Sequence, residues 1–148
     1  MNRRNMFAQM GMAVAAVAGA STVFAVDKLK DDEDAGCCCG TECCDTCSKC
    51  VLECNKCYAH CVAQIAAGHK EYETAMKACL DCTSFCNTCI SVCTRNGVMQ
   101  DIACSACTQA CTMCAKECAK FPDDKVMVAC AKMCMTCAKM CGSCCKKK

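Results

Sequence analysis

The chain has 148 residues, about the size of one ordinary domain, and a formal net charge of +2. Arg3 and Arg4 account for this excess, because the chain after Ala25 carries 15 basic and 15 acidic residues. A balanced surface with few aromatic side chains excludes the basic, aromatic-lined face by which proteins bind nucleic acid. Cysteine contributes 26 residues, far above the share that marks a thiol-dependent scaffold.

Residues 1–25 have the layout of a bacterial export signal: a charged start, an apolar run and small residues before a cleavage point. The adjacent Arg3 and Arg4 resemble a twin-arginine signal, and cleavage is expected after Ala20 or Ala25. We therefore expect an exported protein of the periplasm or cell envelope, with no membrane association after cleavage. The alternative is an uncleaved anchor, since the apolar run is almost long enough to span a bilayer.

Residues 26–40 form a lead-in that is first acidic and then contains three consecutive cysteines, Cys37 to Cys39. Consecutive residues cannot share one face of a helix, so these cysteines are assigned to a loop. The remaining residues, 41–148, form the predicted metal-binding domain.

The cysteines of this domain recur at alternating steps of three and four residues, which places them on one stripe of each helix. These are the a and d positions of a heptad, where a bundle normally places Leu or Ile. The four stripes comprise 21 residues: Cys43, Cys47, Cys50, Cys54, Cys57 and Cys61; Cys79, Cys82, Cys86, Cys89 and Cys93; Cys104, Cys107, Cys111, Cys114 and Cys118; and Cys130, Cys134, Cys137, Cys141 and Cys144. Four stripes predict four helices.

Capping residues and helix breakers delimit these helices. Thr41 is a suitable N-cap for the first helix and Asp123 for the fourth, while Gly68, Gly97 and Pro122 mark the intervening stops. The predicted helices cover residues 42–67, 70–95, 99–120 and 124–145. Because all connections are short, the fold class is all-α: an antiparallel up-down-up-down four-helix bundle with a cysteine-lined core.

Residues beside the stripes test this helical phase. The predicted positions flanking the sulfurs are apolar and are expected to pack between helices: Val51, Tyr58, Phe85, Ile90, Met133 and Met140. Charged residues lie farther from the cysteine stripe around each predicted helix: Lys49, Glu53, Lys56, Lys77, Asp81 and Lys132. The pattern is therefore helical throughout the domain.

Thiols at this spacing favour metal binding over disulfide formation. Cβ atoms three or four residues apart on a helix are about 5 to 6 Å apart, whereas a disulfide needs about 3.5 to 4.5 Å. Soft thiolate ligands favour Cu(I), and a continuous thiol lining without carboxylates suits an ion that can be bound many times over. We predict binding and storage of multiple Cu(I) ions, and an apo bundle that is loose because its core lacks aliphatic side chains.

Four other interpretations compete with this one. Buried Cys can serve as a small apolar residue, but an ordinary heptad seam has no reason to use this one reactive residue at nearly every position. A disulfide-stapled exported structural protein is expected to be rich in loops. A metallothionein-like protein for Zn or Cd detoxification differs only in its ions and is tested by metal titration. A thiol oxidoreductase needs one exposed cysteine of low pKa and a base, so we predict that the chain is not an enzyme.

Softer ligands are predicted at the end of the bundle where the first helix meets the second and the third meets the fourth. His60, His69, Met76 and Met127 are expected there and bind Cu(I) less tightly than thiolate, so they are candidates to admit copper. The opposite end of the bundle is the alternative entry point for copper, since Cys37 to Cys39, Cys144 and Cys145 are expected there.

From about Cys54 to Cys145 the chain resembles the bacterial copper storage proteins. The residues that carry the resemblance are the Cys57–Cys61 segment (CYAHC), the C-x-x-C and C-x-x-x-C pairs of all four helices, and Lys116–Pro122 before the last helix. The resemblance implies a cysteine-lined four-helix bundle that binds many Cu(I) ions, takes up copper at one end through His or Met, and forms homotetramers, with some members exported. This chain has more stripe cysteines than an exported member is expected to have, and Cys37 to Cys39 lie outside the family pattern.

Overall fold

The computed structural model describes residues 41–144. The predicted export signal, the lead-in with Cys37 to Cys39, and Cys145 lie outside the described residues. The described part contains five helical elements: α1 (Thr41–Ala66), the 3₁₀ turn η1 (Lys70–Tyr72), α2 (Glu73–Thr94), α3 (Gln100–Cys118) and α4 (Lys125–Cys144).

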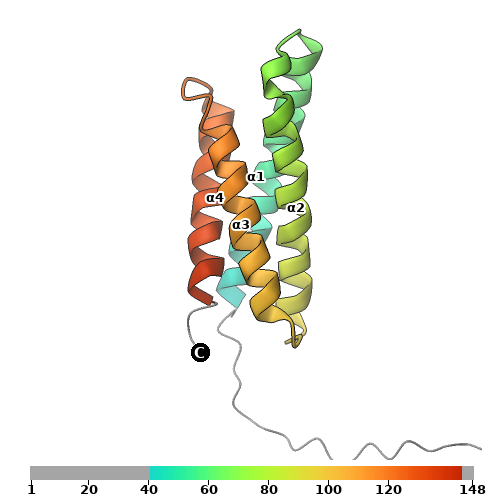
Figure 1. Cartoon of the computed structure of the whole chain (residues 1–148), viewed down its shortest axis with the longest axis vertical. Helices are drawn as coiled ribbons and strands as arrows, with labels where there is room; N and C mark the ends of the chain where they lie inside the picture. The colour runs from blue at the N-terminus through green and yellow to red at the C-terminus, as the bar shows by residue number, and fades with distance from the viewer. Residues whose placement is uncertain (1–40, 145–148) are drawn as a thin grey trace, which may run out of the picture. The chain divides into compact units, whose positions relative to one another are not determined.

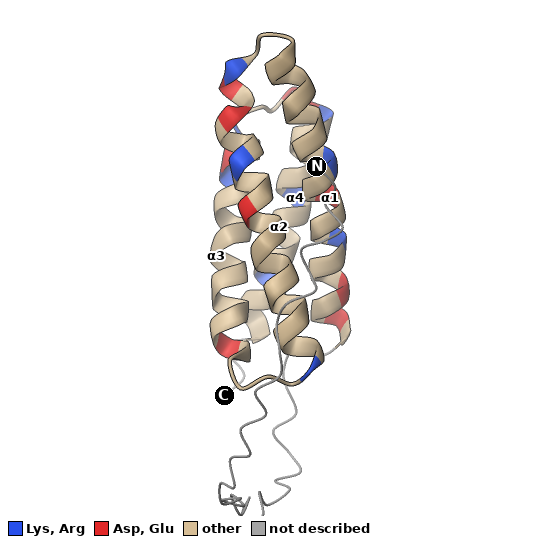
Figure 2. Cartoon of the chain, turned by 90° about the vertical axis from the view of Figure 1, so that its right-hand side faces the viewer, with Lys and Arg blue, Asp and Glu red and all other residues tan. Residues whose placement is uncertain are grey.

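The four α-helices form an antiparallel bundle in which each helix packs on two neighbours. α1 contacts α2 and α4, and α3 contacts the same two helices, so chain order follows the perimeter of the bundle (Figure 1). Acidic and basic residues are interspersed along its outside in the view of Figure 2. The predicted all-α, up-down-up-down bundle is confirmed.

The first two helices end in the same hydrogen-bonded motif. After α1, Gly68 has a φ of 103°, and the backbone N–H of His69 donates to the Gln64 carbonyl at 3.0 Å. After α2, Asn96 takes the left-handed conformation with a φ of 50°, and the Gly97 N–H donates to the Val92 carbonyl at 2.9 Å. Both closures satisfy carbonyls that would otherwise lack partners and turn the chain back on itself.

The helix starts differ from the sequence prediction at three places. Asp124, not Asp123, caps α4: its Oδ1 accepts from the backbone N–H groups of Val126 at 2.9 Å and Met127 at 3.3 Å. These groups are the second and third N–H donors of the helix, which an N-cap side chain satisfies. Residues 70–72 form η1, so α2 starts only at Glu73, and Thr41 is the first residue of α1 itself.

The core of the described bundle contains cysteine, alanine and Met127, with no Leu, Ile, Val or Phe among its buried residues. Ala75 and Ala115 belong to the same buried cluster as the cysteines. Five of the six predicted flanking residues pack partly buried against this core, but Phe85 is 43% exposed and that prediction was wrong. Cys82, Cys86 and Cys89 around it are buried as predicted, so the helical phase holds and Phe85 lies at the exposed edge of the flank.

Of the described helices, α4 is long and apolar enough to cross a membrane by length and composition. Its hydropathy comes largely from the cysteines and methionines of its sequence. In the bundle it packs on α1 and α3 and buries its cysteine stripe.

Candidate metal centre

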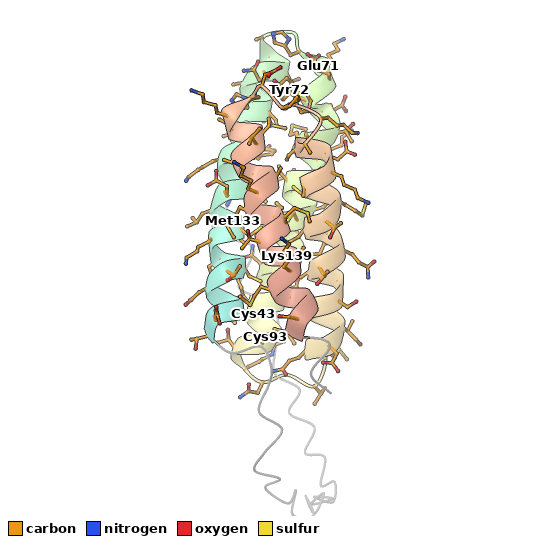
Figure 3. The ribbon with its side chains drawn as sticks, turned by 90° about the vertical axis from the view of Figure 1, so that its left-hand side faces the viewer. Cys43, Glu71, Tyr72, Cys93, Met133 and Lys139 are labelled. Atoms are coloured by element: carbon orange, nitrogen blue, oxygen red, sulfur yellow. The ribbon has the colours of Figure 1, made fainter. Side chains whose placement is uncertain are left out.

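The four cysteine stripes meet along the axis of the bundle. All 21 stripe cysteines are buried, and none of the 22 cysteines in the described part of the chain is joined in a disulfide. The additional one, Cys44, lies just off the stripe and is half-buried, with its Sγ 3.8 Å from Thr94 Oγ1. Figure 3 shows Cys43 and Cys93 near one end of this column and Tyr72 near the other.

Neighbouring sulfurs lie at non-bonded distances that a metal ion can bridge. The shortest described Sγ–Sγ separation, between Cys47 and Cys141, is 3.5 Å, and others extend to 4.0 Å. Contacts run along a helix, as for Cys107 and Cys111 at 3.9 Å, and between helices, as for Cys82 and Cys111 at 3.6 Å. These contacts join twelve of the thiols into one network, and smaller groups are formed by Cys89, Cys93 and Cys104, by Cys57 and Cys118, and by Cys79 and Cys114.

Within this network sulfurs form triangles with edges of 3.5 to 4.0 Å. The described distances define six: Cys47, Cys107 and Cys141; Cys50, Cys54 and Cys134; Cys50, Cys82 and Cys134; Cys54, Cys130 and Cys134; Cys86, Cys107 and Cys111; and Cys89, Cys93 and Cys104. An ion at the centre of such a triangle would lie about 2.2 Å from each sulfur, close to the zinc–thiolate bond length of about 2.3 Å. The apo geometry is therefore already suited to three-coordinate thiolate binding.

Groups of four sulfurs also converge, but they overlap. Cys43, Cys47, Cys89 and Cys141 form one such group, and Cys47 belongs to a second with Cys86, Cys107 and Cys137. Structural zinc sites use closed sets of four ligands. Here neighbouring sets share a sulfur, so they are not closed, separate sites of that kind.

The core environment raises the pKa of some thiols and lowers that of others. Burial raises the pKa of Cys61 to about 11, while hydrogen bonds from Cys111 and Cys134 lower the pKa of Cys50 to about 7. Hydrogen bonding to Cys114 and Cys130 raises the pKa of Cys54. The apo core therefore holds protons that a bound metal ion must displace.

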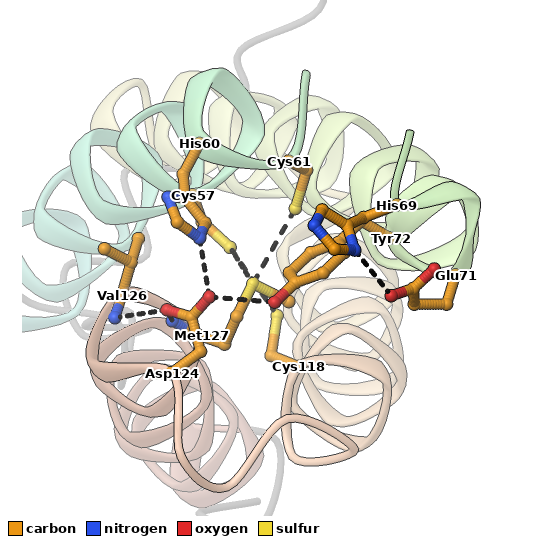
Figure 4. A network of polar contacts seen from close by, with 10 residues as sticks. All are labelled: Cys57, His60, Cys61, His69, Glu71, Tyr72, Cys118, Asp124, Val126 and Met127. Atoms are coloured by element: carbon orange, nitrogen blue, oxygen red, sulfur yellow. Dashed lines mark hydrogen bonds and ion pairs between the residues drawn. The ribbon is translucent and has the colours of Figure 1, made fainter. Parts of the chain in front are cut away.

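At the end formed by the α1–α2 and α3–α4 connections, which we call the His60 end, a polar network covers the sulfurs (Figure 4). Asp124 Oδ2 lies 2.6 Å from His60 Nε2 and accepts from the Tyr72 hydroxyl at 3.1 Å. The Tyr72 ring stacks on Phe121, with centroids 4.1 Å apart. Burial and the Asp124 carboxylate raise the pKa of Tyr72, so its hydroxyl remains a donor.

Beneath this network lies Met127, which is fully buried. The thiols of Cys57 and Cys61 donate to its Sδ at 3.5 and 3.7 Å. The thioether therefore terminates the sulfur column at this end.

The four softer residues predicted at this end are not brought together as one ligand set. Met127 lies within the sulfur column, Met76 packs partly buried against the core, and His60 is held by Asp124. His69 is exposed, with its Nδ1 3.3 Å from a Glu71 carboxylate oxygen. Their role as copper ligands remains a prediction.

Sequence reasoning missed Asp124 and Tyr72, which organise the His60 end. The signal for Asp124 was the Asp-Asp pair before α4, where either residue satisfies the capping rule. Tyr72 had no signal, because its contact with Phe121 joins two connections far apart in the sequence.

Comparison with known proteins identifies this arrangement. The family model described as Csp, copper storage protein, matches residues 33–146, more than three quarters of the chain. The chain belongs to the copper storage protein family. No curated protein sequence matches it.

A solved structure, Cu(I)-bound Copper Storage Protein BsCsp3, is similar to the chain with a TM-score of 0.64 and 26% sequence identity. The match covers 69% of this chain and 93% of that one. Nearly the whole of the solved protein therefore corresponds to the bundle of this chain.

Proposed function

We propose that this copper storage protein binds multiple Cu(I) ions directly through its 21 stripe cysteines. The observation that carries the proposal is the column of buried thiols along the bundle axis, spaced 3.5 to 4.0 Å apart at their described contacts. The Cu(I)-bound structure with which the bundle aligns supports the choice of ion. The role is non-enzymatic, because catalysis by a thiol requires an accessible nucleophile and these thiols are enclosed.

Cu(I) fits the core better than the divalent alternatives. Triangles of sulfur suit an ion that accepts three thiolates, whereas Zn(II) and Cd(II) would compete for the overlapping groups of four. A divalent ion with four thiolates of its own and a Cu(I) ion with three both leave a local charge of −2, and sharing thiolates between neighbouring ions reduces this charge. Low residual charge favours a densely filled, buried core.

Anaerobic titration of the reduced full-length chain tests this function. Cu(I) is added in the presence of the colorimetric chelator bicinchoninate, and bound metal is measured after gel filtration. We expect many equivalents to bind before the chelator takes any, and Zn(II) not to displace them. Saturation after one or two ions would refute the proposal.

Cys134 provides a matched variant for the same titration. It belongs to three of the six sulfur triangles, whereas Cys44 lies off the stripe. Cys134→Ser should lower the capacity by more than one ion, and Cys44→Ser should leave it within one ion of the unmodified chain. Equal capacities would show that the triangles do not define the sites.

We also propose that the chain is exported to the periplasm or cell envelope as a folded protein by means of Arg3 and Arg4. Prior folding would shield the thiols from disulfide formation in an oxidising compartment. Replacing both arginines by lysine should block export, as measured by cell fractionation. Unchanged export would indicate the general secretory route.

We propose a homo-oligomer, a tetramer by analogy with the family. Exposed apolar side chains on the helices, including Leu52, Ile102 and Met113, are available for such contacts. Sedimentation velocity of the reduced chain should give four times the monomer mass. A monomer at micromolar concentration would contradict this assembly.

A further inference from the structure

Charge is divided unevenly along the chain. Residues 41–124 carry seven basic and ten acidic side chains, whereas residues 125–148 carry six lysines and no acidic side chain. Within the described part of this last segment, α4 contributes Lys125, Lys132 and Lys139. Such an asymmetry indicates a basic surface that binds an anionic partner.

These three lysines form one row along the outside of α4, which we call the lysine face. They are seven residues apart, so they lie on the same side of the helix, about 10.5 Å from one another along its axis. Each stands two positions before a buried residue of the core, Met127, Cys134 or Cys141, which places it at the outermost f position of the heptad. All three lysines are exposed, and Lys139 is labelled on α4 in Figure 3.

The charge of the lysine face is not neutralised by neighbouring carboxylates. Among residues 41–144, the ion pairs between lysine and a carboxylate involve Lys56, Lys77 and Lys120, and none involves a lysine of α4. The hydroxyl of Thr136, which lies beside the row, donates to the backbone carbonyl of Lys132 at 3.0 Å. The face therefore offers positive charge to a partner rather than a set of directed hydrogen bonds.

The residue types on α4 favour a diffuse anionic surface over a shaped binding site. The lysine ammonium is a compact, strongly hydrated point charge, whereas arginine predominates where an ion pair is buried in an interface. No arginine is present in α4, and the exposed residues between its lysines, Ala129, Met135 and Thr136, are small or apolar. Lysines on the polar side of an amphipathic helix are typical of proteins that bind anionic lipid headgroups.

A row of lysines can act on a flat membrane surface together. When α4 lies parallel to the surface, all three ammonium groups come within the Debye length, which is about 10 Å at 0.1 M salt. Each basic residue near an anionic membrane strengthens binding about fivefold, so the three together account for roughly a hundredfold. In the sequence, Lys146 to Lys148 follow α4 and carry three more positive charges.

We propose that the lysine face holds the protein reversibly against an anionic lipid membrane, with α4 parallel to the membrane surface. The contact is electrostatic, and the cysteine stripe of α4 stays buried in the bundle. It therefore differs from the uncleaved anchor considered for residues 1–25, and it replaces the expectation that the mature chain has no membrane association. It does not depend on the proposed storage of Cu(I).

Vesicle binding by the full-length reduced chain tests the proposal. The chain is sedimented with vesicles that contain phosphatidylglycerol and phosphatidylcholine, or phosphatidylcholine alone, at about 0.05 M and about 0.5 M NaCl. At low salt it should bind the anionic vesicles about tenfold more tightly or better, and this preference should disappear at high salt. Binding to phosphatidylcholine alone measures the contribution of the apolar run in residues 1–25, which is the same in every variant. No preference, or a preference that persists at high salt, would overturn the proposal.

The triple variant Lys125→Gln, Lys132→Gln and Lys139→Gln should weaken binding to the anionic vesicles about tenfold or more at low salt. Lysine and glutamine have similar helix propensities, and these positions are exposed, so the variant keeps the fold. Circular dichroism checks the helical content. Unchanged binding by this variant would show that the lysine face is not the contact.

A matched control removes the same charge from exposed lysines of η1, α2 and α3: Lys70→Gln, Lys77→Gln and Lys116→Gln. It should bind the anionic vesicles within about threefold of the unmodified chain. Equal weakening by the two triple variants would show that only net charge matters, which would contradict a defined face. Soluble polyglutamate is added as a competitor, and tighter binding to it than to the vesicles would assign the face to an acidic protein and overturn the proposal.

Acetylation of the unmodified chain gives a second readout that needs no variant. Brief treatment with N-hydroxysuccinimidyl acetate, followed by mass spectrometry, measures how fast each lysine reacts with and without anionic vesicles. The vesicles should slow the reaction of Lys125, Lys132 and Lys139 about fivefold or more. Protection of Lys77 and Lys116 instead would place the membrane on another side of the bundle and refute the assignment.

Discussion

Replacement of Asp124 by Ala should destabilise the apo bundle more than any other change of a surface acid in the described chain. Its carboxylate accepts from two backbone N–H groups of α4, from the Tyr72 hydroxyl, and lies 2.6 Å from His60 Nε2. These contacts connect α4 to α1 and to η1. Removing the carboxylate therefore opens the His60 end as well as the first turn of α4.

The expected loss can be built from these contacts. An N-cap aspartate contributes about 1 kcal/mol. The hydrogen bonds with Tyr72 and His60 contribute about 1 kcal/mol each, the ordinary net value rather than the larger one for buried charged partners, because the site is partly exposed. The total of about 3 kcal/mol corresponds to a decrease of roughly 10 to 20 °C in Tm for a domain of this size.

Thermal unfolding of the reduced apo chain, followed by circular dichroism, measures the effect. Asp123→Ala is the matched control, since Asp123 is exposed and the capping bonds belong to its neighbour. It should change stability by less than about 0.5 kcal/mol. If Asp123→Ala were the more damaging change, the capping assignment would be wrong.

The stability difference between the Asp124→Ala variant and the unmodified chain should depend on pH. Burial opposes ionisation of Asp124, but hydrogen bonds from His60, the Met127 N–H, Tyr72 and the Val126 N–H lower its pKa overall. A lowered folded-state pKa stabilises the fold above the unfolded value of about 3.9, and this contribution is lost as pH falls through the folded value. The deficit of Asp124→Ala should therefore be full at pH 6 and shrink below about pH 4. A constant deficit down to pH 2 would refute this linkage.

Further changes have defined outcomes. Loading with Cu(I) should stabilise the fold and raise Tm, since each site contributes about 2.7 kcal/mol when free Cu(I) is 100 times its dissociation constant. An unchanged melting curve would show a self-sufficient core. Tyr72→Phe keeps the ring stack and should cost about 1 kcal/mol in urea unfolding, whereas Phe121→Ala loses the stack and should cost about 2 kcal/mol. The rate of alkylation of Cys61 in the apo chain should increase as pH rises toward 11. Burial raises the pKa of this thiol to about 11, and only the thiolate reacts. A rate that is already maximal at pH 8 would contradict this prediction.

The fold was predictable because the cysteine spacing fixes a helical phase at nearly every turn. That phase determined which residues are buried, and Gly68 and Asn96 terminate their helices as capping rules require. The cysteine spacing and the capping rules could not determine structural details that depend on a single residue, such as the N-cap of α4. Asp123 and Asp124 satisfy the same rule, and in the structure the second of them caps the helix.

The His60 end could not be deduced because its contacts join residues distant in sequence. Tyr72 meets Phe121 and Asp124 only after both helical hairpins have packed together. Phe85 shows the opposite limit, since heptad arithmetic placed it beside the core but its side chain is 43% exposed. Heptad phase alone does not determine how far the neighbouring helix covers a flanking position.

Sharing of sulfurs explains why the core is built almost entirely from one residue type. Cys134 belongs to three triangles and Cys107 to two, so the sites are not independent. If each Cu(I) used three thiolates of its own, each site would carry a charge of −2, which is costly in a buried core. A thiolate that bridges neighbouring ions divides its charge among them. Thiols that bind no ion stay protonated and therefore add no charge to the core. An aliphatic residue at any of these positions would interrupt the sharing, which gives a physical reason for a stripe without Leu or Ile.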